Sequence, residues 1–135
     1  MATVAIATLV VGAAVPAQAA YPTSSYHVVY GQSYSKGTLT WYARGVNYDG
    51  EAKAVAGTCR TTRLETLYAD GSLITKYSNP GGCTVGPDSM SFDVKDTAPA
   101  DVPGGAAWVR LCLMGKAFPS SDPWSTLSCA NYQHP

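Results

Sequence analysis

The sequence predicts an all-β protein, namely a small antiparallel β-sandwich of immunoglobulin-like type with seven or eight strands and two disulfides, or alternatively a small barrel. Three observations support this. Apolar and polar residues alternate with a period of two in several short segments. Gly, Pro and Asp residues that form turns separate these segments at roughly ten-residue spacing. Strand-forming Tyr, Thr and Val are plentiful, whereas only two residues are Glu.

Residues 1–19 have the pattern of a signal peptide. The first twenty residues contain no charged side chain and are mostly apolar or small. Pro16 interrupts this run, and Ala17-Gln18-Ala19 has the small-x-small pattern of a cleavage site. A membrane-spanning helix needs roughly 20 apolar residues, which is longer than this run. We therefore expect a secreted, extracellular protein with no membrane segment after cleavage and with 20–135 as its single domain.

The charge balance gives no reason to expect nucleic acid or an anionic membrane as a partner. Nine Lys and Arg residues balance nine Asp and Glu residues, so the formal net charge is zero. Both kinds of partner are attracted by excess positive charge. Arg60 and Arg63 are the only tight basic pair, and their odd separation places them on opposite faces of a strand. The length is that of one domain, which we expect to be a monomer.

Four cysteines, Cys59, Cys83, Cys112 and Cys129, predict disulfides, because exported thiols meet an oxidising environment. Three pairings are possible. We favour Cys59 with Cys83 and Cys112 with Cys129, since each pair brackets one expected hairpin. A zinc site is not expected, because no two cysteines have C-x2-C spacing and the two histidines lie near opposite ends of the domain. No other motif indicates a metal or a cofactor.

The first strands are expected at 27–30 and 38–44, separated by a turn at 35–37. In the second segment Leu39 and Trp41 fall on one face and polar residues on the other. This alternation is typical of a strand with one buried side.

Two Asp-Gly pairs predict hairpin turns, because both central residues of a type I′ turn need positive φ. Asp49-Gly50 would lead into a returning strand at 51–59. Asp70-Gly71 would join strands at 61–69 and 72–77, and this is the clearest hairpin signal in the sequence.

The most apolar stretch of the domain is 106–114, with Val109, Leu111 and Leu113 on one face and Trp108 on the other. It predicts a central strand buried from both sides, although periodicity leaves a short buried helix open. The remaining expected segments are a strand at 89–94, a connection at 97–105, a loop at 115–124 and a last strand at 125–132.

The sequence shows no catalytic constellation, and we predict that the protein is not an enzyme. A serine hydrolase needs a nucleophile, a base and an acid, and the G-x-S-x-G elbow is absent. His27 would be a base without a placed nucleophile, so we interpret it as an ordinary strand residue. Most carboxylates fall in expected turns and loops, whereas glycoside hydrolysis needs two across a cleft. A small secreted hydrolase is the third functional hypothesis.

Aromatic residues are the one compositional excess, with nine Tyr and three Trp. Such side chains stack on sugars or fill a partner's pocket. Tyr42, Tyr48 and Trp124 are the candidate binding residues, because alternation places the tyrosines away from the Trp41 face and Trp124 lies in a Ser- and Pro-rich loop. Core packing is the competing interpretation, to which we assign Trp41 and Trp108. The first hypothesis is therefore binding of an extracellular glycan or protein.

Segment 116–124 suggests an alternative, a secreted protease inhibitor that acts through the loop from Cys112 to Cys129. A rigid, disulfide-braced loop could present Lys116 or Phe118 to a protease, although a plain connection between strands is the simpler interpretation. With its Ala-rich leader and small Gly-, Thr- and Tyr-rich domain, the sequence resembles short exported bacterial proteins. Its cysteine spacing differs from that of bacterial subtilisin inhibitors and small amylase inhibitors, which counts against the inhibitor.

Overall fold

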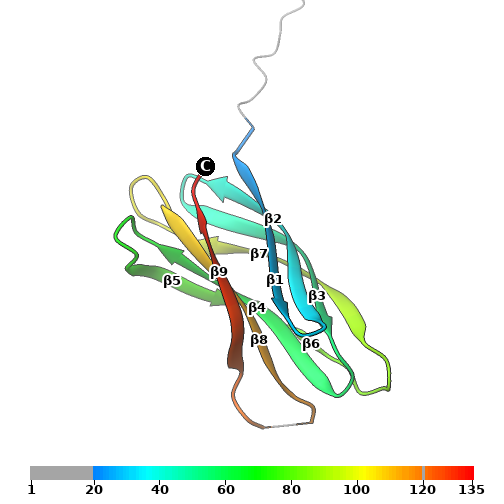
Figure 1. Cartoon of the computed structure of the whole chain (residues 1–135). Coiled ribbons are helices and arrows are strands. Elements are labelled where there is room, and N and C mark those ends of the chain that lie inside the picture. The colour runs from blue at the N-terminus through cyan, green and yellow to red at the C-terminus, as the bar shows by residue number, and fades with distance from the viewer. Residues whose placement is uncertain (1–19, 120) are drawn as a thin grey trace, which may run out of the picture.

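The computed structural model describes residues 20–119 and 121–135, and the expected signal peptide at 1–19 lies outside them. The described chain folds into β-strands joined by short connections (Figure 1). The strands are β1 (Thr23–Tyr30), β2 (Ser33–Tyr42), β3 (Gly45–Ala54), β4 (Thr58–Leu67), β5 (Leu73–Ser78), β6 (Gly82–Cys83), β7 (Met90–Pro99), β8 (Trp108–Ala117) and β9 (Ser125–Gln133).

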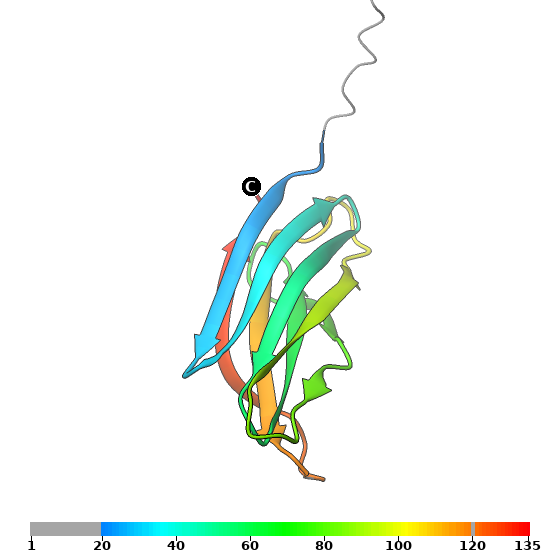
Figure 2. The same cartoon turned by 90° about the vertical axis from the view of Figure 1, so that its right-hand side faces the viewer.

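The strands form two antiparallel sheets stacked as two layers (Figures 1 and 2). Sheet A has the order β1-β2-β3-β7, and sheet B has the order β5-β4-β8-β9, with the short β6 also paired to β4. The connections from β3 to β4 and from β7 to β8 each pass from sheet A to sheet B. The predicted all-β, sandwich-like architecture is therefore confirmed.

The core lies between the sheets and follows from the alternation of each strand. The predicted inner face of β8 is confirmed, since Val109, Leu111 and Leu113 are fully buried. Leu39 and Trp41 of β2 also face the core, as predicted. The largest fully buried side chains are Trp41, Tyr48, Leu39, Leu64, Leu111 and Leu113.

Both favoured disulfides are present. Cys59 and Cys83 are register partners on β4 and β6, with their Cα atoms 4.0 Å apart. Cys112 and Cys129 are register partners on β8 and β9, with a Cα–Cα distance of 4.1 Å. Cys112 alternates with the core residues of β8, so this disulfide lies on the outer face of sheet B.

One of the two expected Asp-Gly turns is correct. Asp70-Gly71 forms the β4–β5 turn, where Gly71 has a φ of +86° and the Tyr68 amide donates to the Ser72 carbonyl oxygen at 2.9 Å. Asp49-Gly50 instead lies in the middle of β3. There Gly50 pairs with Gly37 of β2, and a Cβ atom on either would lie 2.6 Å from the other's Cα. These glycines allow two strands to approach closely, so they do not mark a turn.

The strand limits change accordingly. The expected turn at 35–37 lies inside β2, and the expected strand at 51–59 is wrong because β3 ends at Ala54 and β4 begins at Thr58. The expected loop at 115–124 is shorter, since β8 continues to Ala117.

A tyrosine bridges the two sheets at each open side of the sandwich. On one side the His27 amide of β1 donates to the Tyr132 hydroxyl of β9 at 3.1 Å. On the other side the Tyr77 hydroxyl of β5 donates to Asp96 Oδ2 of β7 at 2.8 Å. These bonds link edge strands that share no backbone ladder. In the described residues, we find no helix with the length and apolarity that crossing a membrane requires.

Candidate functional site

The structure brings together only Lys116 and Trp124 of the four binding residues that the sequence suggested, and it places Tyr42 and Tyr48 elsewhere. Tyr42 is exposed at the end of β2, where its ring meets that of Tyr21 edge-on at 4.7 Å. Trp124 is half-buried in the β8–β9 connection, with Lys116 Nζ 4.9 Å from its ring centroid. Tyr48 is a correction, because it faces the core and is fully buried, so its ring cannot meet a ligand. Its alternation was misjudged because β3 was not expected at this position.

Lys116 also lies elsewhere than predicted. It belongs to β8, where it pairs with Cys59, so it does not occupy the tip of a loop. Phe118 follows the strand and is exposed.

An open groove crosses the outer face of sheet B near the tip of the β4–β5 hairpin. Two neighbouring hollows of about 270 and about 400 Å³ form it, and both are lined by Leu67, Gly71 and Asn131. Trp108 lines the first hollow and Arg110 the second. We call this surface the Trp108 groove, lined by Leu67, Asp70, Gly71, Trp108, Arg110 and Asn131.

Strand pairing brings these side chains together. Trp108 of β8 pairs with Leu67 of β4 on one side and with Gln133 of β9 on the other. Two residues along β8, Arg110 pairs with Asn131. Trp108 and Arg110 alternate with the core residues of β8, so both side chains lie on the outer face.

The polar groups of the Trp108 groove are available to a ligand. Trp108 is half-buried, whereas Arg110 and Asn131 are exposed. Across residues 20–119 and 121–135, the indole, guanidinium and amide groups of these side chains make no hydrogen bond or ion pair. Unused donors and acceptors beside an apolar ring are the usual composition of a small-molecule site.

Asp70 adds a negative charge at the hairpin end of the groove. Its Oδ1 accepts hydrogen bonds from the Ser72 hydroxyl at 2.6 Å and from the Ser72 amide at 2.9 Å. These hydrogen bonds lower the pKa of the exposed Asp70 carboxyl, so it remains a carboxylate. The groove therefore carries one acidic and one basic side chain.

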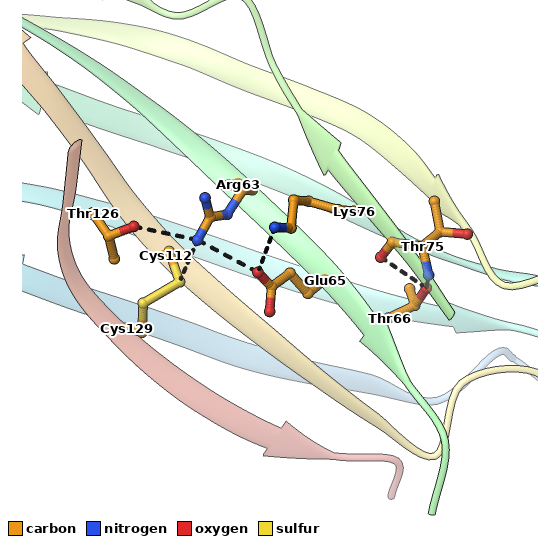
Figure 3. A network of polar contacts seen from close by, with 8 residues as sticks. All are labelled: Arg63, Glu65, Thr66, Thr75, Lys76, Cys112, Thr126 and Cys129. Atoms are coloured by element: carbon orange, nitrogen blue, oxygen red, sulfur yellow. Dashed lines mark hydrogen bonds and ion pairs between the residues drawn. A yellow bond between two sulfur atoms is a disulfide. The ribbon is translucent and has the colours of Figure 1, made fainter. Parts of the chain in front are cut away.

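A polar network next to the groove ties the strands of sheet B together (Figure 3). Glu65 Oε1 lies 3.4 Å from Arg63 Nη2 and 3.9 Å from Lys76 Nζ. Arg63 Nη2 also donates to Thr126 Oγ1 at 3.3 Å and approaches Cys112 Sγ at 3.9 Å. The network joins β4, β5, β8 and β9, and it gives the buried Glu65 carboxylate two basic partners.

A separate open hollow of about 520 Å³ lies on the outer face of sheet A. His27, Lys36, Glu51 and Asp93 line it as one row across the four strands. Lys36 Nζ lies 3.2 Å from Glu51 Oε1, which also accepts a hydrogen bond from the Tyr34 hydroxyl at 3.3 Å. The row groups a histidine with two carboxylates, but Glu51 is already engaged by Lys36 and Tyr34. The lining also contains no serine or cysteine that could serve as a nucleophile. In the described residues, no three His, Cys, Asp or Glu side chains are grouped as metal ligands.

Sequence reasoning missed Trp108 as a surface residue. The alternation of β8 did place it opposite Val109, but the apolar character of both faces suggested burial on both sides. Whether anything covers the outer face of β8 near Trp108 depends on the path of distant segments, which the local pattern does not contain.

No protein-family model matches this sequence, and searches of curated proteins and of solved structures also find no match.

Proposed function

We propose that this protein is a secreted, non-enzymatic domain that binds an extracellular glycan through the Trp108 groove. The observation that carries the proposal is a half-buried indole beside the unengaged side chains of Arg110 and Asn131. An aromatic ring offers an apolar surface on which the C–H face of a sugar can stack. Amide, guanidinium and carboxylate groups supply the donors and acceptors that sugar hydroxyls need.

The dimensions of the groove favour a small ligand over a protein surface. Small-molecule sites have volumes of about 300 to about 1,000 Å³, and the larger hollow, at about 400 Å³, falls in this range. A protein partner would instead be expected to contact a broad, continuous face.

Two further features support the wider proposal. Two disulfides suit an oxidising compartment, because thiols are kept reduced in the cytosol. We also propose an immunoglobulin-like fold. β3 pairs with β7 in one sheet and β4 pairs with β8 in the other, and the connections from β3 to β4 and from β7 to β8 both cross between the sheets. This is the kind of Greek-key arrangement found in immunoglobulin-like sandwiches.

The test is a glycan array probed with the oxidised domain, followed by titration of the best ligand using isothermal titration calorimetry. Trp108→Ala is expected to weaken binding by more than about tenfold, because aromatic anchors contribute most of the affinity of a site. Asn131→Ala changes an exposed side chain, so it should also weaken binding while the domain stays folded.

Trp124→Ala is the matched control, since this second half-buried tryptophan lies outside the Trp108 groove. It should bind the glycan as the unaltered protein does. If Trp108→Ala and Asn131→Ala both bound the glycan with the affinity of the unaltered protein, the proposed site would be refuted. If the domain captured a protein that carries no glycan, the ligand would be a protein and not a glycan.

A further inference from the structure

A hollow of about 310 Å³ lies at the other end of the sandwich, away from the Trp108 groove. It is located where β1 ends and where β8 leads into β9 (Figure 1). The lining comes from four strands, and the residues that matter here are Tyr30, Arg60, Gly115, Lys116, Ser125 and Leu127.

Arg60 faces inward from β4 and is buried without an acidic partner. Only 7% of its surface is exposed. Its Nε donates to Ser33 Oγ at 3.0 Å, and its Nη1 donates to the Cys59 carbonyl oxygen at 2.8 Å. All nine acidic residues belong to the described chain, and none forms an ion pair with Arg60. Burying a charge without a counter-charge is costly.

Glu65 shows the contrasting case in the same strand. It is buried to a similar extent, but Arg63 and Lys76 compensate its charge (Figure 3). Burial lowers the pKa of the Arg60 guanidinium, yet an arginine side chain remains protonated in proteins. Arg60 therefore brings an uncompensated positive charge to the wall of the hollow.

The backbone of β8 is shaped around this guanidinium. A Cβ atom on Gly115 would lie 2.5 Å from Arg60 Nη1 and 3.0 Å from its Cζ. Any side chain at this position would push the guanidinium away. Arg60 Nη2 makes no hydrogen bond within residues 20–119 and 121–135, so its N–H groups remain available.

A second cation lines the same hollow. Lys116 follows Gly115 on β8, and among the described residues no carboxylate forms an ion pair with it. Its Nζ lies over the Trp124 ring. Ser125 and Tyr30 add hydroxyl groups to the lining, whereas Leu127 adds an apolar wall.

We propose that this hollow binds the oxyanion group of a small ligand, with Arg60 as the buried counter-charge and Lys116 at the rim. Carboxylate, sulfate and phosphate groups share the required chemistry, since each presents oxygen atoms that accept charge-assisted hydrogen bonds from a guanidinium. The site is independent of the Trp108 groove, because the two share no lining residue.

The test measures the melting temperature of the oxidised domain in acetate, sulfate and phosphate, each compared with chloride at equal ionic strength. A ligand that binds only the native state raises the melting temperature in a saturable way. We expect at least one of the three anions to do so, and the ranking identifies the preferred group. In parallel, the Gly115 amide and Arg60 Nε–H resonances should shift with the same saturation curve.

Arg60→Met is expected to abolish the rise in melting temperature that the anion causes. Lys116→Met should weaken the apparent affinity for the anion severalfold. Arg110→Met, which removes an arginine from the Trp108 groove, is the matched control and should keep the full effect. If Arg60→Met does not fold, the resonance shifts and Lys116→Met decide the outcome. Melting temperatures equal to those in chloride, or an anion effect that survives in Arg60→Met, would overturn the proposal.

Discussion

Two tyrosines of sheet A are buried with hydroxyl groups that have no hydrogen-bond partner in the described part of the chain. Tyr26 is 2% exposed and Tyr48 is 0% exposed. Burial raises the pKa of Tyr26 to about 12 and also raises that of Tyr48, because the core disfavours a phenolate. Both hydroxyls therefore stay protonated in the folded protein well above neutral pH.

We predict that the free energy of unfolding falls as the pH rises from about 10 to about 12. The Tyr26 hydroxyl of the unfolded chain loses its proton near its ordinary pKa of 10.0, whereas the native chain keeps it up to about 12. The native state binds more protons in this interval, so its stability decreases with pH. The difference amounts to about 3 kcal/mol for Tyr26.

Urea unfolding at a series of alkaline pH values checks this prediction. Tyr26→Phe cannot ionise, so its stability should decline less steeply in the same interval. It should also be at least as stable at neutral pH, because an unsatisfied buried hydroxyl is removed. If the free energy of unfolding declined equally in Tyr26→Phe and in the unaltered protein, the alkaline loss of stability could not be assigned to Tyr26.

A buried pair of hydroxyl groups connects the two sheets. Ser35 of β2 and Thr62 of β4 are both 0% exposed, and their side-chain oxygens lie 2.5 Å apart. Thr62→Val keeps the shape but leaves the Ser35 hydroxyl without this partner, so we expect a loss of about 1 to about 3 kcal/mol.

Chemical denaturation of the two single variants and the double variant checks the coupling. Adding Ser35→Ala to Thr62→Val should recover part of the loss, because no unpaired hydroxyl remains. Strict additivity of the two single effects would show that the pair contributes nothing to the contact between the sheets.

The roles of single residues were only partly predictable. The odd spacing of Arg60 and Arg63 correctly placed them on opposite faces of β4, and the alternation of β8 placed Trp108 opposite the core residue Val109. The local sequence pattern could not indicate which outer surface stays open, or that Gly115 leaves room for the Arg60 guanidinium. Both depend on contacts between strands that are distant in sequence.

Among the strand elements, the pairing of β8 with β9 supports the Trp108 groove most directly. The Cys112–Cys129 disulfide lies two residues from the Arg110 and Asn131 pair, and Cys129 itself lines the groove. The disulfide therefore ties the backbones of β8 and β9 together next to the positions of the two polar side chains.

We predict that Cys112→Ala combined with Cys129→Ala lowers the free energy of unfolding by about 3 kcal/mol, as expected for a closed loop of this length. The same change should weaken the proposed glycan binding, because β8 and β9 gain freedom beside the groove. Denaturant titration and ligand titration measure the two effects.

The matched control replaces Cys59 and Cys83 by alanine. This disulfide ties down only the short β6, and neither cysteine lines the Trp108 groove. It should cost a similar amount of stability with little change in affinity. Equal loss of affinity in both double variants would argue that stability alone accounts for the effect.

Only one of the two Asp-Gly pairs was predictable as a turn from its local sequence. Asp70-Gly71 forms a turn because Tyr68 and Ser72 can close it locally. Asp49-Gly50 has the same two residues, but its glycine is needed for the close approach of β2 and β3. A dipeptide preference cannot distinguish these uses, because the second depends on a partner strand.

For the whole molecule, the favoured disulfide pairing was predictable because each pair of cysteines is close in sequence and brackets one hairpin. The number and spacing of short strands favoured a sandwich of two sheets, which is confirmed, although they left a small barrel open. The sheet order did not follow, because the crossings after β3 and β7 leave no local pattern.

We predict that reduction of both disulfides unfolds the domain or brings it close to unfolding. Each disulfide contributes on the order of 3 kcal/mol in the chain-entropy model, while a domain of this size has a total stability of about 5 to about 15 kcal/mol. Circular dichroism with and without a thiol reductant measures the change. A reduced protein with unaltered melting behaviour would show that the β-sandwich core is sufficient by itself.

Both ends of the described domain leave the sandwich beside Trp41, since its amide donates to the Pro22 carbonyl oxygen at 2.9 Å and its ring centroid lies 5.1 Å from that of His134. A bead, dye or fusion partner joined to either end would consequently sit on that side of the molecule. Immobilised in this way, the domain would present the Arg60 hollow outward to the solution. Sensor-chip measurements of the proposed anion binding are thus feasible without attaching anything at the end that holds the Arg60 hollow.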